Sequence, residues 1–300
     1  MIYDAVILGG GPAGLQAALM LGRACRSVLL CDTGEPRNAP APHSHGFFTR
    51  DGAPPRELLA LGRADLRAYP RVELRDVAIT GAELREGGFT VALATGEAVS
   101  ARGLIIASGV RDQLPDTPGF REHWGRSVFA CPYCHGWEVR GQPLAVYGQD
   151  AYAEHMVTLI RAWSDDVVLV SDGPLGWDAA ARARLARLGV GVEEGVVVGL
   201  EGDADGLQRI RFADGSSLAR RALLYRPPFT PRSDIPTRLG AAFGDNGLPV
   251  ATDPFYQTTV PGLYVVGDLA QMAPSVLLAA ASGSMAGAGL NHALAARDAR

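Results

Sequence analysis

The sequence contains no lysine: all 28 basic residues among its 300 positions are arginine. A Schiff-base mechanism needs the amine of a lysine, and a Walker-type phosphate loop needs its ammonium, so both kinds of site are excluded. The net charge is −4 and the arginines are scattered along the chain, which argues against a nucleic acid as partner.

Cysteine is scarce too, and the four residues are too few for a disulfide framework in a chain of this length. Cys25 and Cys31 are expected to be small, buried packing residues. The longest weakly polar run, 275–290, is rich in Ala, Gly and Ser and makes a poor membrane span. Residues 1–4 lead directly into a strand-like run with no basic segment before it, so no secretory signal is expected. These features predict a cytoplasmic protein.

Glycine is abundant, with 37 residues, and its clearest pattern follows a strand-type run at 2–8 and precedes a helical pattern at 15–21. The residues between them are Gly9, Gly10, Gly11, Pro12, Ala13 and Gly14. In a dinucleotide site of the form G-x-G-x-x-G, Gly9 permits the turn, Gly11 lets a pyrophosphate approach, and Gly14 lets helix and strand pack closely. The pattern therefore predicts a dinucleotide site at the N-terminus of the helix.

The next segments extend this site. A second strand is expected at 27–31 and ends at Asp32, about 20 residues after the glycines, where a carboxylate would hold a ribose hydroxyl. Residues 33–56 are rich in Pro, Gly, His and Arg and lack a clear period, and a loop of this length is usually functional. Its Arg37, Asn38 and His45 could line a cofactor, although a solvated loop explains the composition equally well.

Two proline-containing segments, 109–119 and 226–236, predict crossings between domains. Between them, 143–148 and 167–170 have the pattern of the first two strands of another dinucleotide-binding unit. Near the end of the chain, 275–294 is expected to form a closing helix.

The segment Cys131-Pro132-Tyr133-Cys134-His135-Gly136 lies between the glycine-rich regions. One cysteine of a C-x-x-C pair can attack an outside sulfur while the other resolves the mixed disulfide. Pro132 suits the first turn of a helix, which would place Cys131 at the N-cap, where the helix dipole lowers the pKa of a thiol. Half of a zinc site and a C-x-x-C-H haem attachment are the alternatives, but neither a second ligand pair nor an export signal accompanies them.

Taken in order, the Gly9 to Gly14 motif, Ala107-Ser108-Gly109, the C-x-x-C pair and the run from Pro261 to Asp268 resemble the low-molecular-weight thioredoxin reductase family of flavoproteins. The resemblance spans the whole chain. It implies an α/β fold with two Rossmann-like dinucleotide-binding domains, the second inserted in the first. It also implies FAD as the cofactor and a homodimer.

The same resemblance implies the domain ranges and the cofactor site. The FAD-binding domain would comprise 1–113 and 248–300, and the inserted domain, which carries the redox disulfide, would comprise 114–247. The residues expected to bind FAD are Gly9, Gly11, Pro12, Ala13, Gly14, Asp32, Arg37, Asn38, His45, Val77, Gly267, Asp268 and Val276.

The inserted domain departs from the family pattern. Where the family carries G-x-G-x-x-A, this sequence runs from Gly148 to Ala153 with Asp150 at the position that backbone must occupy near a pyrophosphate. A carboxylate there blocks and repels the phosphates. No basic residue lies between Arg161 and Arg182, where an NADPH site needs one. Weak or absent nicotinamide binding is expected, unless arginines from elsewhere in the fold compensate.

His135 stands where these reductases usually carry an acid. A C-x-x-C-H core is similar to that of dithiol oxidases of the gliotoxin and holomycin type, which pass electrons from a dithiol to dioxygen without a nicotinamide. This resemblance implies that Cys131 exchanges with substrate and that Cys134 faces the flavin, while His135 can move thiol protons. A plain surface histidine is the alternative for His135.

Two other functions stay open. One is a reductase of thioredoxin or of a small disulfide, fed by a nicotinamide or by ferredoxin. The other is a flavin redox sensor of low turnover.

Overall fold

The computed structural model describes residues 2–271 and 273–300, which form two compact units. The first unit comprises residues 1–39, 53–111 and 229–300, and the second comprises 40–52 and 112–228. Segment 229–247 thus clusters with the first unit and loop 40–52 with the second. The domain ranges 1–113, 114–247 and 248–300 stay a prediction.

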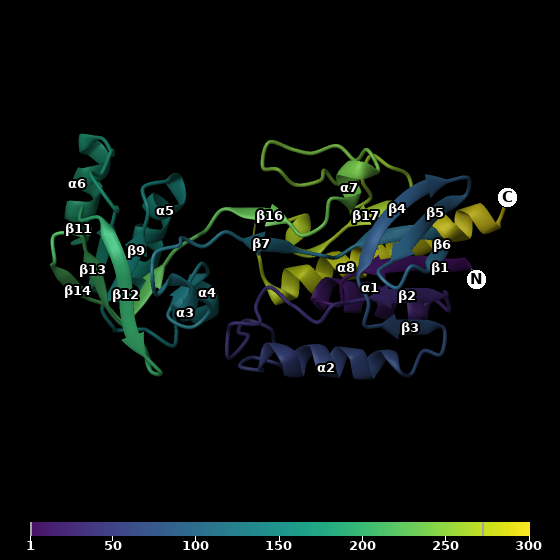
Figure 1. Cartoon of the computed structure of the whole chain (residues 1–300), viewed down its shortest axis with the longest axis horizontal. Coiled ribbons are helices and arrows are strands. Elements are labelled where there is room, and N and C mark those ends of the chain that lie inside the picture. The colour runs from purple at the N-terminus through teal and green to yellow at the C-terminus, as the bar shows by residue number, and fades with distance from the viewer. Residues whose placement is uncertain (1, 272) are drawn as a thin grey trace. The chain divides into compact units, whose positions relative to one another are not determined.

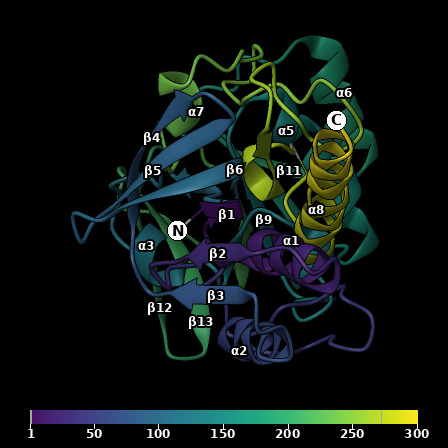
Figure 2. The same cartoon turned by 90° about the vertical axis from the view of Figure 1, so that its right-hand side faces the viewer.

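The first unit is built on a sheet in the order β3-β2-β1-β6-β5-β4, with β17 beside β6 (Figures 1 and 2). Its strands are β1 (Ile2–Leu8), β2 (Val28–Cys31), β3 (Val72–Arg75), β4 (Ile79–Arg85), β5 (Gly88–Leu93), β6 (Ala98–Ile106) and β17 (Leu263–Val265). The pairs among β3, β2, β1, β6 and β17 are parallel, and β4 and β5 add an antiparallel hairpin. The parallel part is the β-α-β arrangement that the glycine motif predicts.

The helices of this unit are α1 (Pro12–Arg23), α2 (Pro55–Leu66), α7 (Ile235–Arg238) and α8 (Val276–Asp298), with the 3₁₀ turn η2 (Gly267–Leu269) after β17. Figure 2 shows α1 and α8 side by side on one face of the sheet. Side chains alternate along a strand, so Ala5 and Ile7 of β1 pack under these helices while Val6 packs on the opposite face. Two apolar cores therefore hold the end of β1, where the glycine turn begins.

The second unit has a parallel five-stranded sheet in the order β11-β10-β9-β15-β8. Its strands are β8 (Val128–Phe129), β9 (Leu144–Tyr147), β10 (Val167–Val170), β11 (Gly191–Glu193) and β15 (Ala222–Leu224). The helical elements are α3 (Phe120–His123), α4 (Pro132–His135), α5 (Ala151–Leu159), η1 (Ile160–Ala162) and α6 (Ala179–Arg187). The strands β12 (Val197–Asp203), β13 (Gly206–Phe212) and β14 (Ser217–Ala219) form a separate antiparallel sheet.

The two segments expected to connect the domains pair with each other, through β7 (Val110–Asp112) and β16 (Phe229–Pro231). Each unit has a β-α-β core with parallel strands, and the predicted class of two Rossmann-like domains is confirmed. The prediction for Cys25 is wrong, because this residue is exposed at the end of α1, while Cys31 is buried as expected. In the part of the chain that the structure describes, no helix combines the length and the apolar character needed to cross a membrane.

Candidate active site

The turn after β1 is too tight for side chains at two of its glycines. Gly9 has φ +104°, and a Cβ added there would lie 2.5 Å from the carbonyl oxygen of Ala107. A Cβ at Gly14 would lie 1.8 Å from the carbonyl oxygen of Gly9. Both glycines are therefore required by the packing of α1 on the sheet, as the sequence predicts.

Gly11 differs from these two glycines because it faces open space. Apart from its chain neighbours, no atom of the described residues lies within 4 Å of a Cβ built there, and φ is −72°, which any residue can adopt. Gly11 is the N-cap of α1 but supplies no side-chain cap, so the first N–H groups of the helix, at Ala13 and Gly14, receive no side-chain acceptor from it. An open N-terminus of this kind is suited to a phosphate group.

The hydroxyl of Ser108 lies beside this turn and is buried without a hydrogen-bond partner among the described residues. A buried hydroxyl without a partner is costly, and a bound polar ligand would supply one. The open space at Gly11 and the Ser108 hydroxyl both fit the pyrophosphate part of FAD.

Asp32 ends β2 next to the same turn, and its side chain is 14% exposed. Burial alone would raise the pKa of Asp32, but hydrogen bonds from the Gly10 backbone and from the Arg63 guanidinium bring this pKa below its usual value. Nη2 of Arg63, in α2, lies 2.7 Å from Oδ2 of Asp32. The carboxylate is thus ionised at neutral pH and can accept ribose hydroxyls. The sequence did not predict a role for Arg63, because the pattern of a surface helix does not indicate that this arginine pairs with Asp32.

The structure brings two other predicted cofactor residues together. Nη1 of Arg37 lies 2.9 Å from Oδ2 of Asp268, which follows Gly267 in the η2 turn. The Gly267 N–H donates to the Ser282 hydroxyl of α8 at 2.9 Å, which fixes the turn to this helix.

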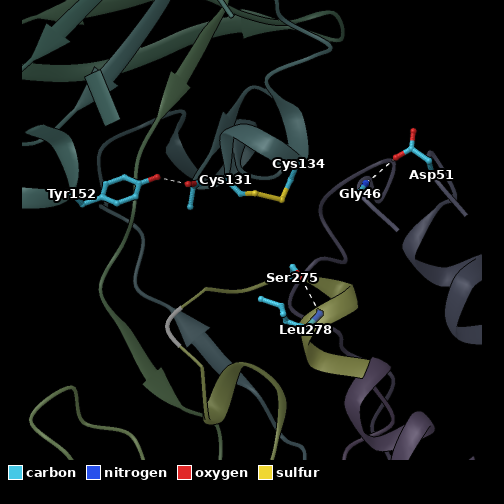
Figure 3. The surroundings of a disulfide bond; sticks show 8 residues. Gly46, Asp51, Cys131, Cys134, Tyr152, Ser275 and Leu278 are labelled. Atoms are coloured by element: carbon cyan, nitrogen blue, oxygen red, sulfur yellow. Dashed lines mark hydrogen bonds between the residues drawn. A yellow bond between two sulfur atoms is a disulfide. The ribbon is translucent and has the colours of Figure 1, made fainter. Parts of the chain in front are cut away.

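The remaining predicted cofactor residues are more dispersed. Val276 is the first residue of α8, and the hydroxyl of Ser275 caps that helix by accepting from the Leu278 N–H at 3.0 Å (Figure 3). Val77 is a partly buried residue packed on the first core, and Asn38 lies in the loop after β2. His45 clusters with the second unit. Their roles toward FAD stay predictions.

In the second unit, Cys131 and Cys134 form a disulfide at the one-turn helix α4 (Figure 3). Cys131 is the N-cap and Pro132 the first residue of this helix, as the sequence predicts. Across residues 2–271 and 273–300, no cluster of three or more metal-ligating side chains occurs.

Tyr152 of α5 fixes the backbone before the disulfide. Its hydroxyl donates a hydrogen bond to the carbonyl oxygen of Ala130, the residue that precedes Cys131 (Figure 3). Burial raises the pKa of Tyr152 to about 12, so the phenol keeps its proton and remains a donor at neutral pH. The start of α5 therefore positions the redox pair, a role that the sequence did not indicate.

His135 is not a surface histidine. Its ring stacks on Phe129, with centroids 5.0 Å apart and planes inclined by 17°. Both ring nitrogens are buried; the Gly125 backbone lies nearby, but no group among the described residues meets hydrogen-bond geometry to either nitrogen. Burial lowers the pKa of His135 although the charge of Glu138 partly opposes this. The imidazole is therefore neutral at pH 7 and able to accept a proton.

The turn that would bind a second dinucleotide is occupied by its own side chains. Oδ1 of Asp150 accepts a hydrogen bond from the Ala153 N–H at 2.9 Å and so caps α5. The amide of Gln149 donates to the Ser171 carbonyl at 2.9 Å and accepts from the Gly176 N–H at 3.0 Å. The helix N-terminus where a pyrophosphate would bind already has an anionic cap.

Asp172, just after β10, is also engaged within the protein. Its carboxylate accepts hydrogen bonds from the Tyr147 hydroxyl at 2.5 Å and from the Val197 N–H at 2.7 Å. The next arginine along the chain, Arg182, pairs with Glu194 at 3.0 Å. Asp172, the acid that would bind a ribose, and Arg182 are therefore both engaged with other residues of the protein.

A model of the pyridine nucleotide-disulphide oxidoreductase family matches residues 3–286. The chain belongs to this family. It is 32% identical to thioredoxin reductase aclD of Aspergillus oryzae, over 98% of this chain and 97% of that protein. The crystal structure of HlmI superposes with a TM-score of 0.93 at 41% identity, covering 99% of this chain and 94% of that one. An oxidoreductase from Agrobacterium tumefaciens superposes with a TM-score of 0.92 at 39% identity, covering 98% and 99% of the two chains.

Membership makes the protein a thioredoxin reductase-like flavoenzyme with FAD as its cofactor. The first unit carries a cradle that fits this cofactor, and the second carries a formed disulfide. The chemistry open to the protein is therefore exchange of electrons between thiols and a flavin.

Proposed function

We propose that the protein is an FAD-dependent dithiol oxidase, which closes a disulfide in a small dithiol, delivers the electrons to dioxygen and does not use NADPH. The observation that carries this proposal is the turn from Gly148 to Ala153. There, Asp150 caps the helix that a coenzyme pyrophosphate would otherwise face. A reductase fed by NADPH at this position needs an open second turn, whereas an oxidase does not.

The chain's own residues supply the sulfur chemistry. A substrate thiolate attacks the sulfur of Cys131, the Cys131–Cys134 bond breaks, and Cys134 leaves as a thiolate. The second substrate thiolate then attacks the substrate sulfur of the mixed disulfide, which forms the product disulfide and releases Cys131 as a thiolate. FAD, held by the cradle of the first unit, would supply the acceptor for the electron pair of the two cysteine thiolates, with dioxygen as the final oxidant that is reduced to hydrogen peroxide.

His135 fits the oxidase direction because each turnover begins with two substrate thiols that must lose protons. A neutral imidazole next to Cys134 in the sequence can accept one of these protons at a time, and burial keeps the pKa of His135 low enough for this neutral state. Its unpartnered ring nitrogens would find a partner in the substrate thiol.

A disulfide reductase is the second candidate, since the relative from Aspergillus oryzae is named a thioredoxin reductase. In that case a thioredoxin-like protein or a small disulfide would accept electrons at Cys131. A nicotinamide bound elsewhere, or ferredoxin, would supply them. The homodimer and the cytoplasmic location expected from the sequence stay predictions.

The donor that reduces the flavin distinguishes the oxidase from a reductase fed by NADPH and from a sensor. The yellow holoenzyme is mixed without oxygen with either dithiothreitol or NADPH, and the flavin absorbance is followed. We expect rapid bleaching by the dithiol and none by NADPH, with Cys134→Ser as an unreactive control. On admission of oxygen, the dithiol-reduced enzyme should regain its colour and form one peroxide per disulfide. Rapid bleaching by NADPH would reject the oxidase, and bleaching by neither donor would favour a sensor.

A further inference from the structure

The segment that connects β10 with α6, residues 171–177, returns to the turn after β9. The strands β9 and β10 are parallel neighbours, and Tyr147 is paired with Val170 at their carboxyl ends. In a dinucleotide-binding unit the ligand lies along this edge, with its pyrophosphate at the first turn and a ribose at the end of the second strand. The course of the segment therefore decides whether this edge is open to a coenzyme.

Gln149, in the turn after β9, holds both ends of the segment. Its side-chain amide donates to the Ser171 carbonyl at 2.9 Å, and its Oε1 accepts from the Gly176 N–H at 3.0 Å. Its backbone carbonyl accepts from the Trp177 indole N–H at 2.8 Å. One residue of the pyrophosphate turn thus ties down the start and the end of the segment, which forms a strap beside the turn.

The backbone after β10 directs the strap toward this turn. Asp172 has φ +55° and Gly173 has φ +118°, so the chain reverses directly after the strand. Aspartate and glycine are among the residues that adopt positive φ values most readily. The Ser171 hydroxyl donates to the Gly173 carbonyl at 2.6 Å and stabilises the reversal. The return of the strap to Gln149 therefore follows from the local sequence.

The middle of the strap is anchored in the second unit. Leu175 is 3% exposed and belongs to the apolar core beneath α5, and the ring of Trp177 packs on the same core. The Leu175 N–H donates to Oε1 of Glu194 at 2.8 Å, and its carbonyl accepts from Arg182. A ligand that lifted the strap would have to expose Leu175 and break these bonds.

We propose that this strap, held by Gln149, excludes nicotinamide coenzymes from the second unit and remains closed when the Asp150 carboxylate is removed. The proposal rests on the dithiol oxidase function, which does not use NADPH. A coenzyme could bind only the open form, so its apparent affinity falls by the fraction of molecules in which the strap is open. Gln149 is thus a specificity-determining residue for the electron donor.

The test uses holoenzyme variants that separate the strap from the carboxylate. Asp150→Gly removes the charge and lets backbone approach a pyrophosphate. Gln149→Ala with Trp177→Phe removes the bonds between strap and turn and keeps an aromatic ring on the core. A combined variant carries all three substitutions. Gln208→Ala is the matched control, because its amide donates to Oδ2 of Asp203 at 2.5 Å, away from the strap.

Two quantities are compared: hydrogen exchange of the Leu175 N–H by NMR, and binding of NADH by calorimetry. The Leu175 N–H is bonded to Glu194 and not to Gln149, so its exchange reports opening of the strap and not the loss of its own partner. NADH is the probe because no basic residue lies between Arg161 and Arg182 to hold the 2′-phosphate of NADPH.

The strap substitutions should speed exchange of the Leu175 N–H about tenfold, because the bonds that they remove favour the closed form. Asp150→Gly should keep the slow exchange and show no saturable binding at millimolar NADH. The combined variant should bind NADH, with a Kd at least about tenfold below the limit set by Asp150→Gly. Gln149→Ala alone should give a smaller change of exchange in the same direction, and Gln208→Ala should match the wild type.

Other outcomes overturn the proposal. If exchange of the Leu175 N–H stays slow without Gln149 and the indole, these groups do not hold the strap. If exchange speeds up but the combined variant does not bind NADH, the strap is not the barrier. Binding of NADH by Asp150→Gly with slow exchange would assign the whole exclusion to the carboxylate.

Failure of the oxidase function would be seen separately, as bleaching of the wild-type flavin by NADPH. If exchange of the Leu175 N–H stays slow in that mixture, the strap is closed and the donor reaches the flavin by another route, in agreement with the strap. If NADPH speeds this exchange in the wild type, the strap yields to the coenzyme and the proposal is wrong.

Discussion

Gly11 offers a sharp test of the FAD cradle, because a methyl group there touches nothing in the protein itself. In the part of the chain that the structure describes, no atom outside its chain neighbours lies within 4 Å of its Cβ position, and its φ of −72° suits alanine. We therefore expect Gly11→Ala to leave the stability of the apoprotein within about 0.5 kcal/mol of the wild type. The same methyl group would occupy the space through which a pyrophosphate approaches the start of α1.

The expected loss of FAD affinity follows from steric overlap. Overfilling a well-packed site costs about 1–3 kcal/mol, which corresponds to roughly 5- to 150-fold weaker binding. Gly14→Ala is expected to differ, because its Cβ would lie 1.8 Å from the Gly9 carbonyl oxygen. The strand and helix must then separate, so this variant should lose both apoprotein stability and FAD.

The assay combines thermal unfolding of the apoprotein with titration of FAD followed by flavin fluorescence. Gly199→Ala in β12 is the control, since its Cβ would have only an ordinary contact, 3.8 Å from the Pro118 carbonyl oxygen. Wild-type FAD affinity in Gly11→Ala would refute the assignment of the cradle. A stability loss in Gly11→Ala as large as that in Gly14→Ala would show that Gly11 is needed for packing.

Three further predictions concern the second unit. Tyr152→Phe leaves the Ala130 carbonyl without its donor and should destabilise the unit by about 1–3 kcal/mol in denaturant unfolding; no change would mean that water replaces the phenol. Asp150→Ala removes a helix cap and should cost about 1 kcal/mol, while Asp150→Asn retains the cap, and neither should gain NADPH binding in calorimetry. Because burial keeps the folded-state pKa of His135 below that of the unfolded chain, stability should fall as the pH drops below about 6.5. In His135→Gln, the urea midpoint should fall less steeply with decreasing pH than in the wild type. Some fall should remain, because burial also lowers the pKa of His123. An unchanged dependence of the midpoint on pH would contradict the burial argument.

The elements with strong local signals were predictable from the sequence. The glycine turn after β1 and the N-cap at Cys131 both follow from short-range backbone geometry, which residue types report directly. The end of the last helix was less accurate: α8 extends to Asp298 instead of 294. The residues near this end carry no apolar period, so the pattern fades before the helix does.

The side-chain partners of the site were beyond the sequence, because they join residues far apart in the chain. Nothing local to Tyr152 indicates a bond to Ala130, and nothing in loop 40–52 indicates that His45 meets Glu138. In the turn from Gly148 to Ala153, the sequence alone shows that Asp150 stands at the phosphate-binding position. Only the structure shows that this carboxylate caps α5 by accepting from the Ala153 N–H.

Tyr152 has a consequence for redesign of the protein. Helix α5 begins at the turn where a coenzyme would bind. Its second residue, Tyr152, also holds the backbone of Ala130 just before the disulfide. Substitutions that reopened this helix start for a coenzyme would shift the tyrosine and loosen the cysteines. Coenzyme use and thiol reactivity are thus mechanically linked here, and a library that varies one would have to screen for the other.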